Sequence, residues 1–195
     1  VELVGESAAV VPGQALRLGL RIRHDPHWHT YWRNPGDSGL PTQVVLTLPE
    51  GWKAGEIVWP APQRVFVGPL ASYAYEGEIL LPMPVEVPRS APAGTARIAA
   101  RVQWLMCREV CIPGEADLSL EIPVASSARP SAHAALFDRA ARETPSERVG
   151  ARAGLGQGVL SLAFDRPGVR TAEFFPYAEG WLSAPAPQSL YRIGD

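Results

Sequence analysis

Alternating hydrophobic and polar residues predict β-strands through the first 124 residues of the chain. Residues 16–23 alternate strictly, with leucines and an isoleucine on one side, which is typical of a half-buried strand. The other strand candidates share this alternation or are short apolar runs that stop at prolines: residues 44–48, 57–59, 78–81, 96–106 and 118–124. Strands at this spacing, with no helix between them, predict an all-β domain, an immunoglobulin-like β-sandwich, with a barrel as the alternative.

The pattern changes after residue 124. Residues 126–146 read as a linker with a short helix over residues 132–142, which Ser131 would cap and Pro145 would end. Two more strand candidates follow at residues 159–164 and 169–175. Because two or three strands cannot bury a core alone, either these residues dock on the first domain or they begin a second one. We expect a first domain over 1–125, a linker over 126–146 and a partial second β domain over 147–195.

The composition excludes several classes of protein. The chain has 195 residues, of which 46% are hydrophobic and 19% charged, as in globular rather than disordered proteins. A net charge of −2 argues against a general nucleic-acid binder. No apolar run reaches the roughly 18 residues of a membrane span, and the first residues lack the pattern of a signal peptide. Two cysteines are too few for a scaffold held by disulfides.

The two cysteines, Cys107 and Cys111, lie close together in the sequence. On one continuous strand they would be about 13 Å apart, but a hairpin with a three-residue loop would place them about 4.5–5.5 Å apart, within disulfide range. Such a bridge closes about five residues and would contribute roughly 2 kcal/mol, so it would be a weak structural staple. Thiol–disulfide exchange, an inert bridge, two reduced thiols and a metal site all remain open from spacing alone.

A histidine pair lies in an aromatic-rich stretch of the sequence. His27, His29 and Tyr31 would share one strand face, because side chains two residues apart point the same way. With Cys107 and Cys111 the histidines offer ligands that suit Cu(I), so these four residues form an alternative metal site, although His-x-His is a weak signal. The chain shows no phosphate-binding loop and no Ser/His/Asp order.

Two motifs together resemble a known family. The first is Cys107-x-x-x-Cys111 with Trp-Leu before it and Pro-Gly-Glu after it, and the second is the run WHTYWRNPGDSGLPT at residues 28–42. Over residues 1–125 the chain resembles the amino-terminal periplasmic domain of DsbD-type thiol:disulfide interchange proteins, and it looks most like the ScsB branch, named for suppression of copper sensitivity. Residues 147–195 resemble the start of the second β domain in that branch.

The resemblance implies an immunoglobulin-like fold and protein-disulfide reductase activity, with Cys107 and Cys111 as the catalytic pair and no bound cofactor. Electrons would come from the membrane part of the same polypeptide through its C-terminal thioredoxin-like domain, and they would pass to periplasmic thiol oxidoreductases. The domain would lie on the periplasmic side of the bacterial inner membrane, attached to it through the rest of the protein. The processes implied are copper tolerance and cytochrome c biogenesis.

The resemblance also suggests residues that flank the cysteines. His29 and Tyr31 fall where DsbD domains carry a tyrosine pair beside the cysteines, and residues 66–75 fall in the region of a cap loop whose aromatic side chain shields the disulfide. Within that stretch we favour Tyr73 as the shielding residue, although a plain strand connection is the alternative. A copper-binding or copper-resistance module and a purely structural β domain with an inert bridge are the rival functions.

Overall fold

The computed structural model describes residues 1–146 and 149–192. Its chain divides into two compact units, one made of residues 1–144 and 175–186 and the other of the described residues of 145–174 and 187–195. The strands and the helix are β1 (Glu2–Gly5), β2 (Ala15–Arg23), β3 (His29–Gly36), β4 (Gln43–Thr47), β5 (Lys53–Ala54), β6 (Gln63–Val67), β7 (Leu70–Glu76), β8 (Glu78–Glu86), β9 (Gly94–Cys107), β10 (Cys111–Val124), α1 (Ala134–Glu143), β11 (Ala151–Gly156) and β12 (Val159–Phe164).

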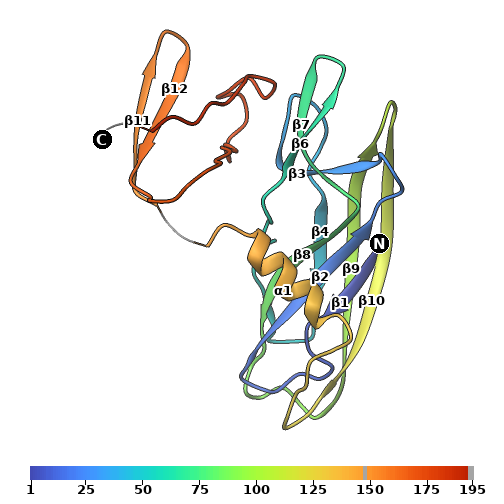
Figure 1. Cartoon of the computed structure of the whole chain (residues 1–195). Coiled ribbons are helices and arrows are strands. Elements are labelled where there is room, and N and C mark those ends of the chain that lie inside the picture. Colours follow the sequence, from blue (N-terminus) through green and yellow to red (C-terminus); the bar gives the residue numbers. More distant parts are fainter. Residues whose placement is uncertain (147–148, 193–195) are drawn as a thin grey trace. The chain divides into compact units, whose positions relative to one another are not determined.

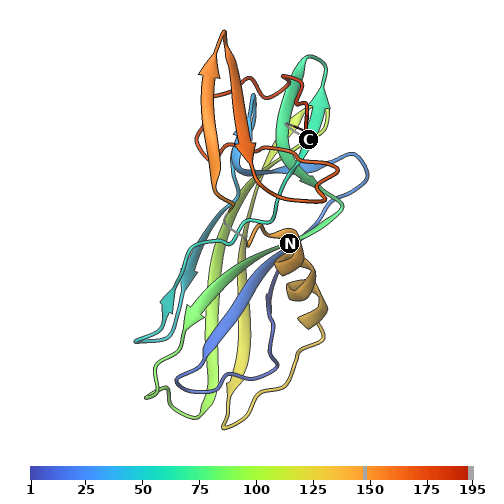
Figure 2. The ribbon, with the colours of Figure 1, turned by 60° about the vertical axis from the view of Figure 1, so that its left-hand side comes forward.

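The first unit is a sandwich of two antiparallel sheets (Figure 1). The smaller sheet has the order β1-β2-β8-β5, and the larger has the order β10-β9-β3-β7-β6, with β4 also pairing with β9. Strand β9 is long and runs beside β10 along its whole length, which both ribbon views show (Figures 1 and 2). The predicted all-β, immunoglobulin-like fold is confirmed.

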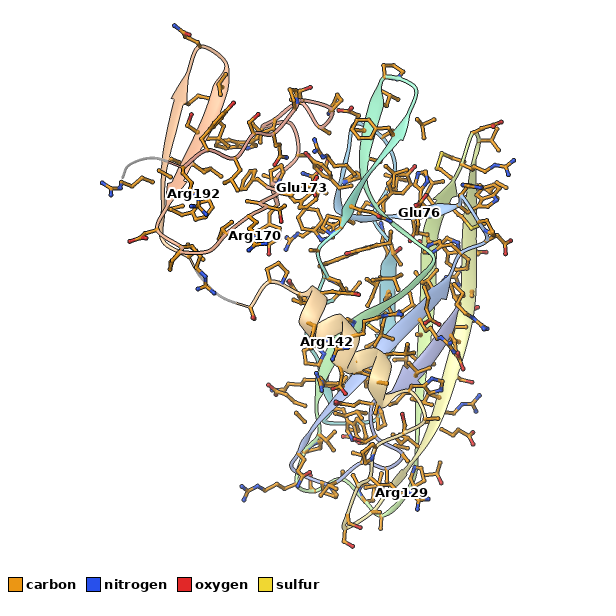
Figure 3. All side chains as sticks on the ribbon, viewed as in Figure 1. Glu76, Arg129, Arg142, Arg170, Glu173 and Arg192 are labelled. Carbon is orange, nitrogen blue, oxygen red and sulfur yellow. A yellow bond between two sulfur atoms is a disulfide. The ribbon has the colours of Figure 1, made fainter. Side chains whose placement is uncertain are left out.

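The core between the sheets follows the predicted alternation. Leu18 and Leu20 of β2 are fully buried, as are Ile98 and Val102 of β9. Because a strand turns alternate side chains to opposite faces, these positions form one apolar layer, and the residue next to each of them in the chain points to the other face of its sheet. Side chains fill the space between the sheets (Figure 3).

Strand β8 continues through the two prolines that were expected to end it. Pro82 and Pro84 have no N–H to donate, but their carbonyl oxygens accept hydrogen bonds from Val58 N at 2.7 Å and Gly55 N at 2.8 Å. At these two positions the partner segment bonds to carbonyls of β8, so the missing N–H groups cost the sheet little. Residues 57–59, expected to be a strand of their own, instead make this irregular pairing.

Helix α1 packs against the smaller sheet rather than lying in a free linker. Phe137 and Ala140 are buried with Val4 of β1 and Leu80 of β8. The expected cap residue lies before the helix, where Ser131 Oγ donates to the carbonyl of Gly5 at 2.6 Å. Residues 126–144 consequently belong to the first unit, which corrects the expected boundary at residue 125.

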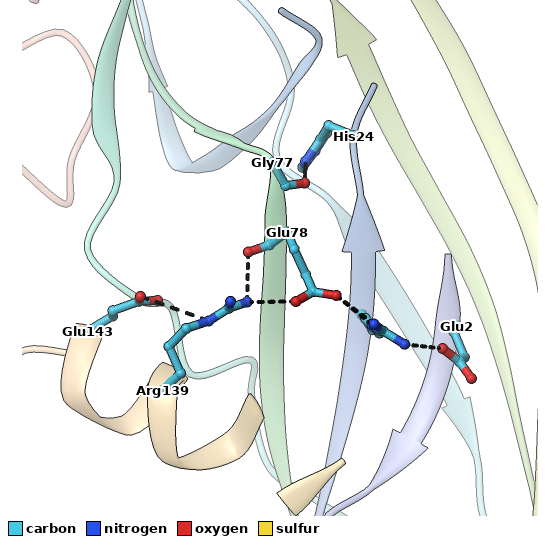
Figure 4. A network of polar contacts seen from close by, with 7 residues as sticks. Glu2, His24, Gly77, Glu78, Arg139 and Glu143 are labelled. Atoms are coloured by element: carbon cyan, nitrogen blue, oxygen red, sulfur yellow. Dashed lines mark hydrogen bonds and ion pairs between the residues drawn. The ribbon is translucent and has the colours of Figure 1, made fainter. Parts of the chain in front are cut away.

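A chain of ion pairs crosses the outside of the smaller sheet and reaches α1 (Figure 4). Arg21 pairs with Glu2 at 3.1 Å and with Glu78 at 2.6 Å. Arg139 of the helix pairs with the other oxygen of Glu78 at 3.4 Å and with Glu143 at 4.0 Å. Each exposed pair contributes at most about 1 kcal/mol, so this network orients the helix more than it holds it.

The second unit contains the β11–β12 hairpin. The predicted strand at 159–164 is confirmed as β12, but its partner β11 precedes it, and residues 169–175 form no strand. Leu155 and Val159 are exposed, as expected where two strands are too few to bury a core. The ends of the expected second domain, residues 147–148 and 193–195, lie outside the described residues.

Residues 175–186 return to the first unit, so the expected domain 147–195 is divided in the structure. Phe175 meets Tyr73 edge to face with ring centroids 5.3 Å apart, and it lies 6.1 Å from the ring of Trp32. Asn34 Nδ2 donates to the carbonyls of Pro176 at 2.7 Å and Ala178 at 3.2 Å. The residues in the two Asn34 contacts are separated by 142 and 144 positions in the chain. Local sequence patterns cannot predict contacts over such separations.

Candidate functional site

The two cysteines form a disulfide at the tip of the β9–β10 hairpin. Cys107 ends β9, Cys111 begins β10, and the two residues are register partners with Cα atoms 4.1 Å apart. The loop between them is closed by a hydrogen bond of 3.1 Å from Arg108 N to the carbonyl of Val110. The predicted three-residue loop and the predicted bridge are both confirmed.

The two sulfur-bearing residues differ sharply in exposure. Cys107 is only 3% exposed, whereas Cys111 is exposed. The cause is their position in the sheet, because β9 has neighbours on both sides while the Cys111 end of β10 pairs with β9 alone among the described residues. Cys111 is therefore the more accessible of the two residues.

Cys107 packs in a small apolar cluster with Tyr31 and Ala74, against Val65 and Leu105; we call these five residues the sulfur cluster. Tyr31 of β3 and Ala74 of β7 are register partners, so they point to the same face of the larger sheet. That face is the outer one, because the next residues along both strands belong to the main core.

Tyr31 links the cluster to the exposed sulfur. Its ring is 1% exposed, and its hydroxyl oxygen lies 3.9 Å from Cys111 Sγ. Burial raises the pKa of Tyr31 above its ordinary value, so the hydroxyl keeps its proton at physiological pH. The hydroxyl can thus donate a hydrogen bond to Cys111 when that sulfur carries charge.

The loop that follows β3 covers Tyr31. Gly39 has φ +107°, and a Cβ added there would lie 2.2 Å from Tyr31 Cε1, so the backbone presses against the ring. The loop is held by a hydrogen bond of 3.0 Å from Ala71 N to Asp37 Oδ2 and by contact of the Ser38 and Ser72 hydroxyls at 3.2 Å. The sequence shows Gly39 within the motif at residues 28–42. It does not show that this glycine packs against Tyr31.

Tyr73 does not shield the disulfide. It is buried in the main core and meets Trp32 edge to face with centroids 6.3 Å apart. Because it neighbours Ala74 along β7, it points to the opposite face of the sheet from the sulfur cluster. This corrects its expected shielding role. The surrounding stretch forms most of the β6–β7 hairpin.

His29 lies beside the buried cysteine. It is the register partner of Cys107 on β9 and of Glu76 on β7. Glu76 is labelled in Figure 3. Its ring is 1% exposed and meets Tyr31 edge to face, with centroids 5.2 Å apart. Burial lowers the pKa of His29, while the charge of Glu76 opposes part of that shift. The structure therefore brings His29 and Tyr31 together with both cysteines.

His27 does not join this group. It lies before β3 in a turn with φ 69° and is exposed, so it does not alternate with His29 along a strand. Cys107 and Cys111 are bonded to each other. Among the described residues, no group of three or more His, Cys, Asp or Glu side chains is placed to hold a metal ion. The alternative site of two histidines and two cysteines is not assembled here.

The surface beside Cys111 carries apolar and cationic groups. Val110 and Ile112, on either side of Cys111, are exposed. The guanidinium of Arg108 lies 5.7 Å from the ring centroid of Trp28, which fixes the loop tip against the turn before β3. Exposed apolar side chains beside a reactive sulfur are suited to transient contact with another protein.

Comparison with known proteins agrees with this geometry. The family model for the N-terminal domain of the thiol:disulfide interchange protein DsbD matches residues 1–123. The chain belongs to this family. The expected family is thereby confirmed, together with a general role of the DsbD N-terminal domain in thiol–disulfide interchange. Among curated protein sequences, none matches the chain.

One solved structure supports the fold. The N-terminal periplasmic domain of ScsB from Proteus mirabilis matches with a TM-score of 0.60 and 19% identity, covering 85% of this chain and 63% of that one. The reduced N-terminal domain of DsbD from Neisseria meningitidis matches with a TM-score of 0.32 and 16% identity, over 66% of this chain and 90% of that one. No helix in the described ranges is long and apolar enough to cross a membrane.

Proposed function

We propose that this domain is a protein-disulfide reductase module that exchanges thiols and disulfides through Cys107 and Cys111. The observation that carries the proposal is the unequal exposure of the two residues in one bridge, with Cys111 exposed and Cys107 only 3% exposed. A bridge that only stabilised the fold would gain nothing from an accessible sulfur. It would also close a loop too short to contribute more than about 2 kcal/mol.

The exchange runs through a mixed disulfide. In the reduced domain the Cys111 thiolate attacks a disulfide of the partner, and one partner sulfur leaves with the electron pair. Cys107 then attacks Cys111 Sγ, which breaks the mixed disulfide and releases the second partner sulfur. The partner gains two electrons and two protons, and the Cys107–Cys111 bridge forms again. These steps need no bound cofactor.

Tyr31 favours the reactive form of Cys111. Its hydroxyl stays protonated and lies 3.9 Å from Cys111 Sγ, so it can donate to the thiolate. A hydrogen bond to the charged form of a group stabilises that form. His29 belongs to the same flanking group on β3.

Family membership and the surface beside Cys111 support the partners that we propose. Electrons would arrive from the C-terminal thioredoxin-like domain of the full-length protein, and periplasmic thiol oxidoreductases would receive them. With these partners the domain would lie on the periplasmic side of the inner membrane. Val110 and Ile112 supply exposed apolar contacts on both sides of Cys111, which a partner can cover during the exchange.

Two single variants test the proposal. Cys107→Ser keeps the exposed thiol and removes the group that resolves the mixed disulfide, so it should accumulate an adduct with glutathione disulfide. Cys111→Ser keeps only the buried thiol and should react at least about tenfold more slowly, because access limits exchange. Mass spectrometry after acid quenching measures both adducts. Equal rates for the two variants would contradict the assigned roles.

The reduction potential separates this function from an inert bridge. Structural disulfides have potentials below about −300 mV, and redox-active ones lie higher. Equilibration of the wild-type domain with glutathione or dithiothreitol buffers gives the value. A potential below that limit would refute the reductase role.

A further inference from the structure

The geometry points to His29 as the group that takes the proton from Cys107 when the buried thiol resolves the mixed disulfide. This inference rests on the proposed function and adds a residue to it. His29 is fixed beside Cys107 by strand pairing between β3 and β9. Directly paired residues of antiparallel strands have Cβ atoms about 4.5–5.5 Å apart, within reach of a ring and a sulfur.

The ring of His29 packs on Tyr31, but its two nitrogens have no hydrogen-bonding role that the described structure shows. It is 1% exposed, and within the described chain neither Nδ1 nor Nε2 has a hydrogen-bond partner. Leaving a buried polar atom unpaired is unfavourable, so such an atom needs an explanation. His24 shows the contrast, because its nitrogens contact the carbonyl of Gly77 at 2.7 Å and Thr30 Oγ1 at 2.9 Å.

The chemistry of the second step needs a proton acceptor at this place. Cys107 must lose its proton before its sulfur can attack, and burial disfavours a thiolate that has no partner. Water cannot serve readily, because Cys107 is only 3% exposed. Outside the disulfide itself, the titratable groups facing His29 are Tyr31 on its own strand, Glu76 on β7 and His24 before β3.

These neighbours leave His29 ready to accept a proton. Burial lowers its pKa, so the ring is neutral in the oxidised domain and carries a free lone pair. The charge of Glu76 favours the protonated ring once it forms. In the step, the Cys107 proton moves to a ring nitrogen and Cys107 Sγ bonds to Cys111 Sγ. The partner sulfur leaves as a thiolate and collects a proton, which the imidazolium returns through solvent.

The test separates formation of the mixed disulfide from its resolution. The reduced 195-residue chain is mixed with glutathione disulfide between pH 5 and pH 9, quenched with acid and analysed by mass spectrometry. His29→Gln should form the Cys111 adduct at the wild-type rate but resolve it at least about tenfold more slowly at pH 7, with a changed pH profile. His27→Asn is the matched control, because His27 is exposed in the turn before β3 and Asn tolerates its positive φ, and it should resolve the adduct like the wild type.

A second measurement uses the unaltered protein and does not depend on how variants fold. The titration midpoint of the His29 ring, followed by NMR, should rise by more than about half a pH unit when the disulfide is reduced. The role of His29 would be overturned if His29→Gln resolved the mixed disulfide at the wild-type rate, or if the titration midpoint of His29 were the same in the oxidised and reduced domains. Either result would leave the proposed exchange at Cys111 intact. Absence of any adduct at Cys111 would instead overturn the proposed function, and the inference with it.

Discussion

Replacing Gly39 by Ala should destabilise the domain and disturb the disulfide site together. The added Cβ would lie 2.2 Å from Tyr31 Cε1 and 2.3 Å from Cζ, distances that side chains do not tolerate. The φ of +107° adds backbone strain for any residue with a Cβ. The strain costs about 1–2 kcal/mol and forced overpacking about 1–3 kcal/mol more, so we expect a total loss of about 2–5 kcal/mol.

A second glycine separates these two contributions. Gly68 has φ +60°, and a Cβ there would meet nothing within 4 Å, so Gly68→Ala should show the strain alone. Urea unfolding should therefore give a loss for Gly39→Ala that exceeds the loss for Gly68→Ala by about 1–3 kcal/mol. Only the first variant should slow the reaction of Cys111 with glutathione disulfide, because only it displaces Tyr31. Equal losses of stability would refute the close packing of the loop on Tyr31.

The remaining predictions concern the bridge, the ion pairs and Tyr31. Reduction of the Cys107–Cys111 bridge, or its replacement by two serines, should lower the free energy of unfolding by no more than about 2 kcal/mol and leave the circular dichroism spectrum unchanged. A hydrogen bond from Arg21 lowers the pKa of Glu78, so its contribution to stability is complete above the ordinary glutamate pKa and is lost as pH falls through the lowered value. Urea unfolding at pH 6 and at pH 3 should accordingly show a smaller acid loss in Glu78→Gln than in the wild type. Tyr31→Phe should slow the attack of Cys111 on glutathione disulfide severalfold near neutral pH, because the charged sulfur loses a donor, and an unchanged rate would remove that role.

Local features of the fold could be predicted from the sequence. The strict alternation at residues 16–23 and 96–106 corresponds to β2 and β9, because each of these strands has one face in the core. The hairpin at Cys107 and Cys111 was also predictable, since loop length alone places residues at its two ends opposite each other.

Features that depend on distant partners could not be predicted in this way. Strand β8 continues through Pro82 and Pro84 because residues 55–58 donate hydrogen bonds to the carbonyls of these two prolines. Tyr73 faces the core because β7 is registered to β3, and its stretch of sequence gave no alternation by which to choose a face. Phe175 packs on the sandwich although a whole hairpin separates it from helix α1 in the chain.

The reactivity of the bridge follows from which two strands it joins. Strand β9 lies inside the sheet, so Cys107 is sheltered by its neighbours, while β10 is an edge strand, so Cys111 faces solvent. A bridge between two interior strands would bury both sulfurs and prevent exchange, and a bridge between two free strands would let a partner attack either one. Under the proposed mechanism, joining an interior strand to an edge strand directs the attack to Cys111 and keeps Cys107 paired with His29. In the mechanism that we propose, the choice of Cys111 over Cys107 as the attacked residue therefore depends on sheet topology as much as on the cysteines themselves.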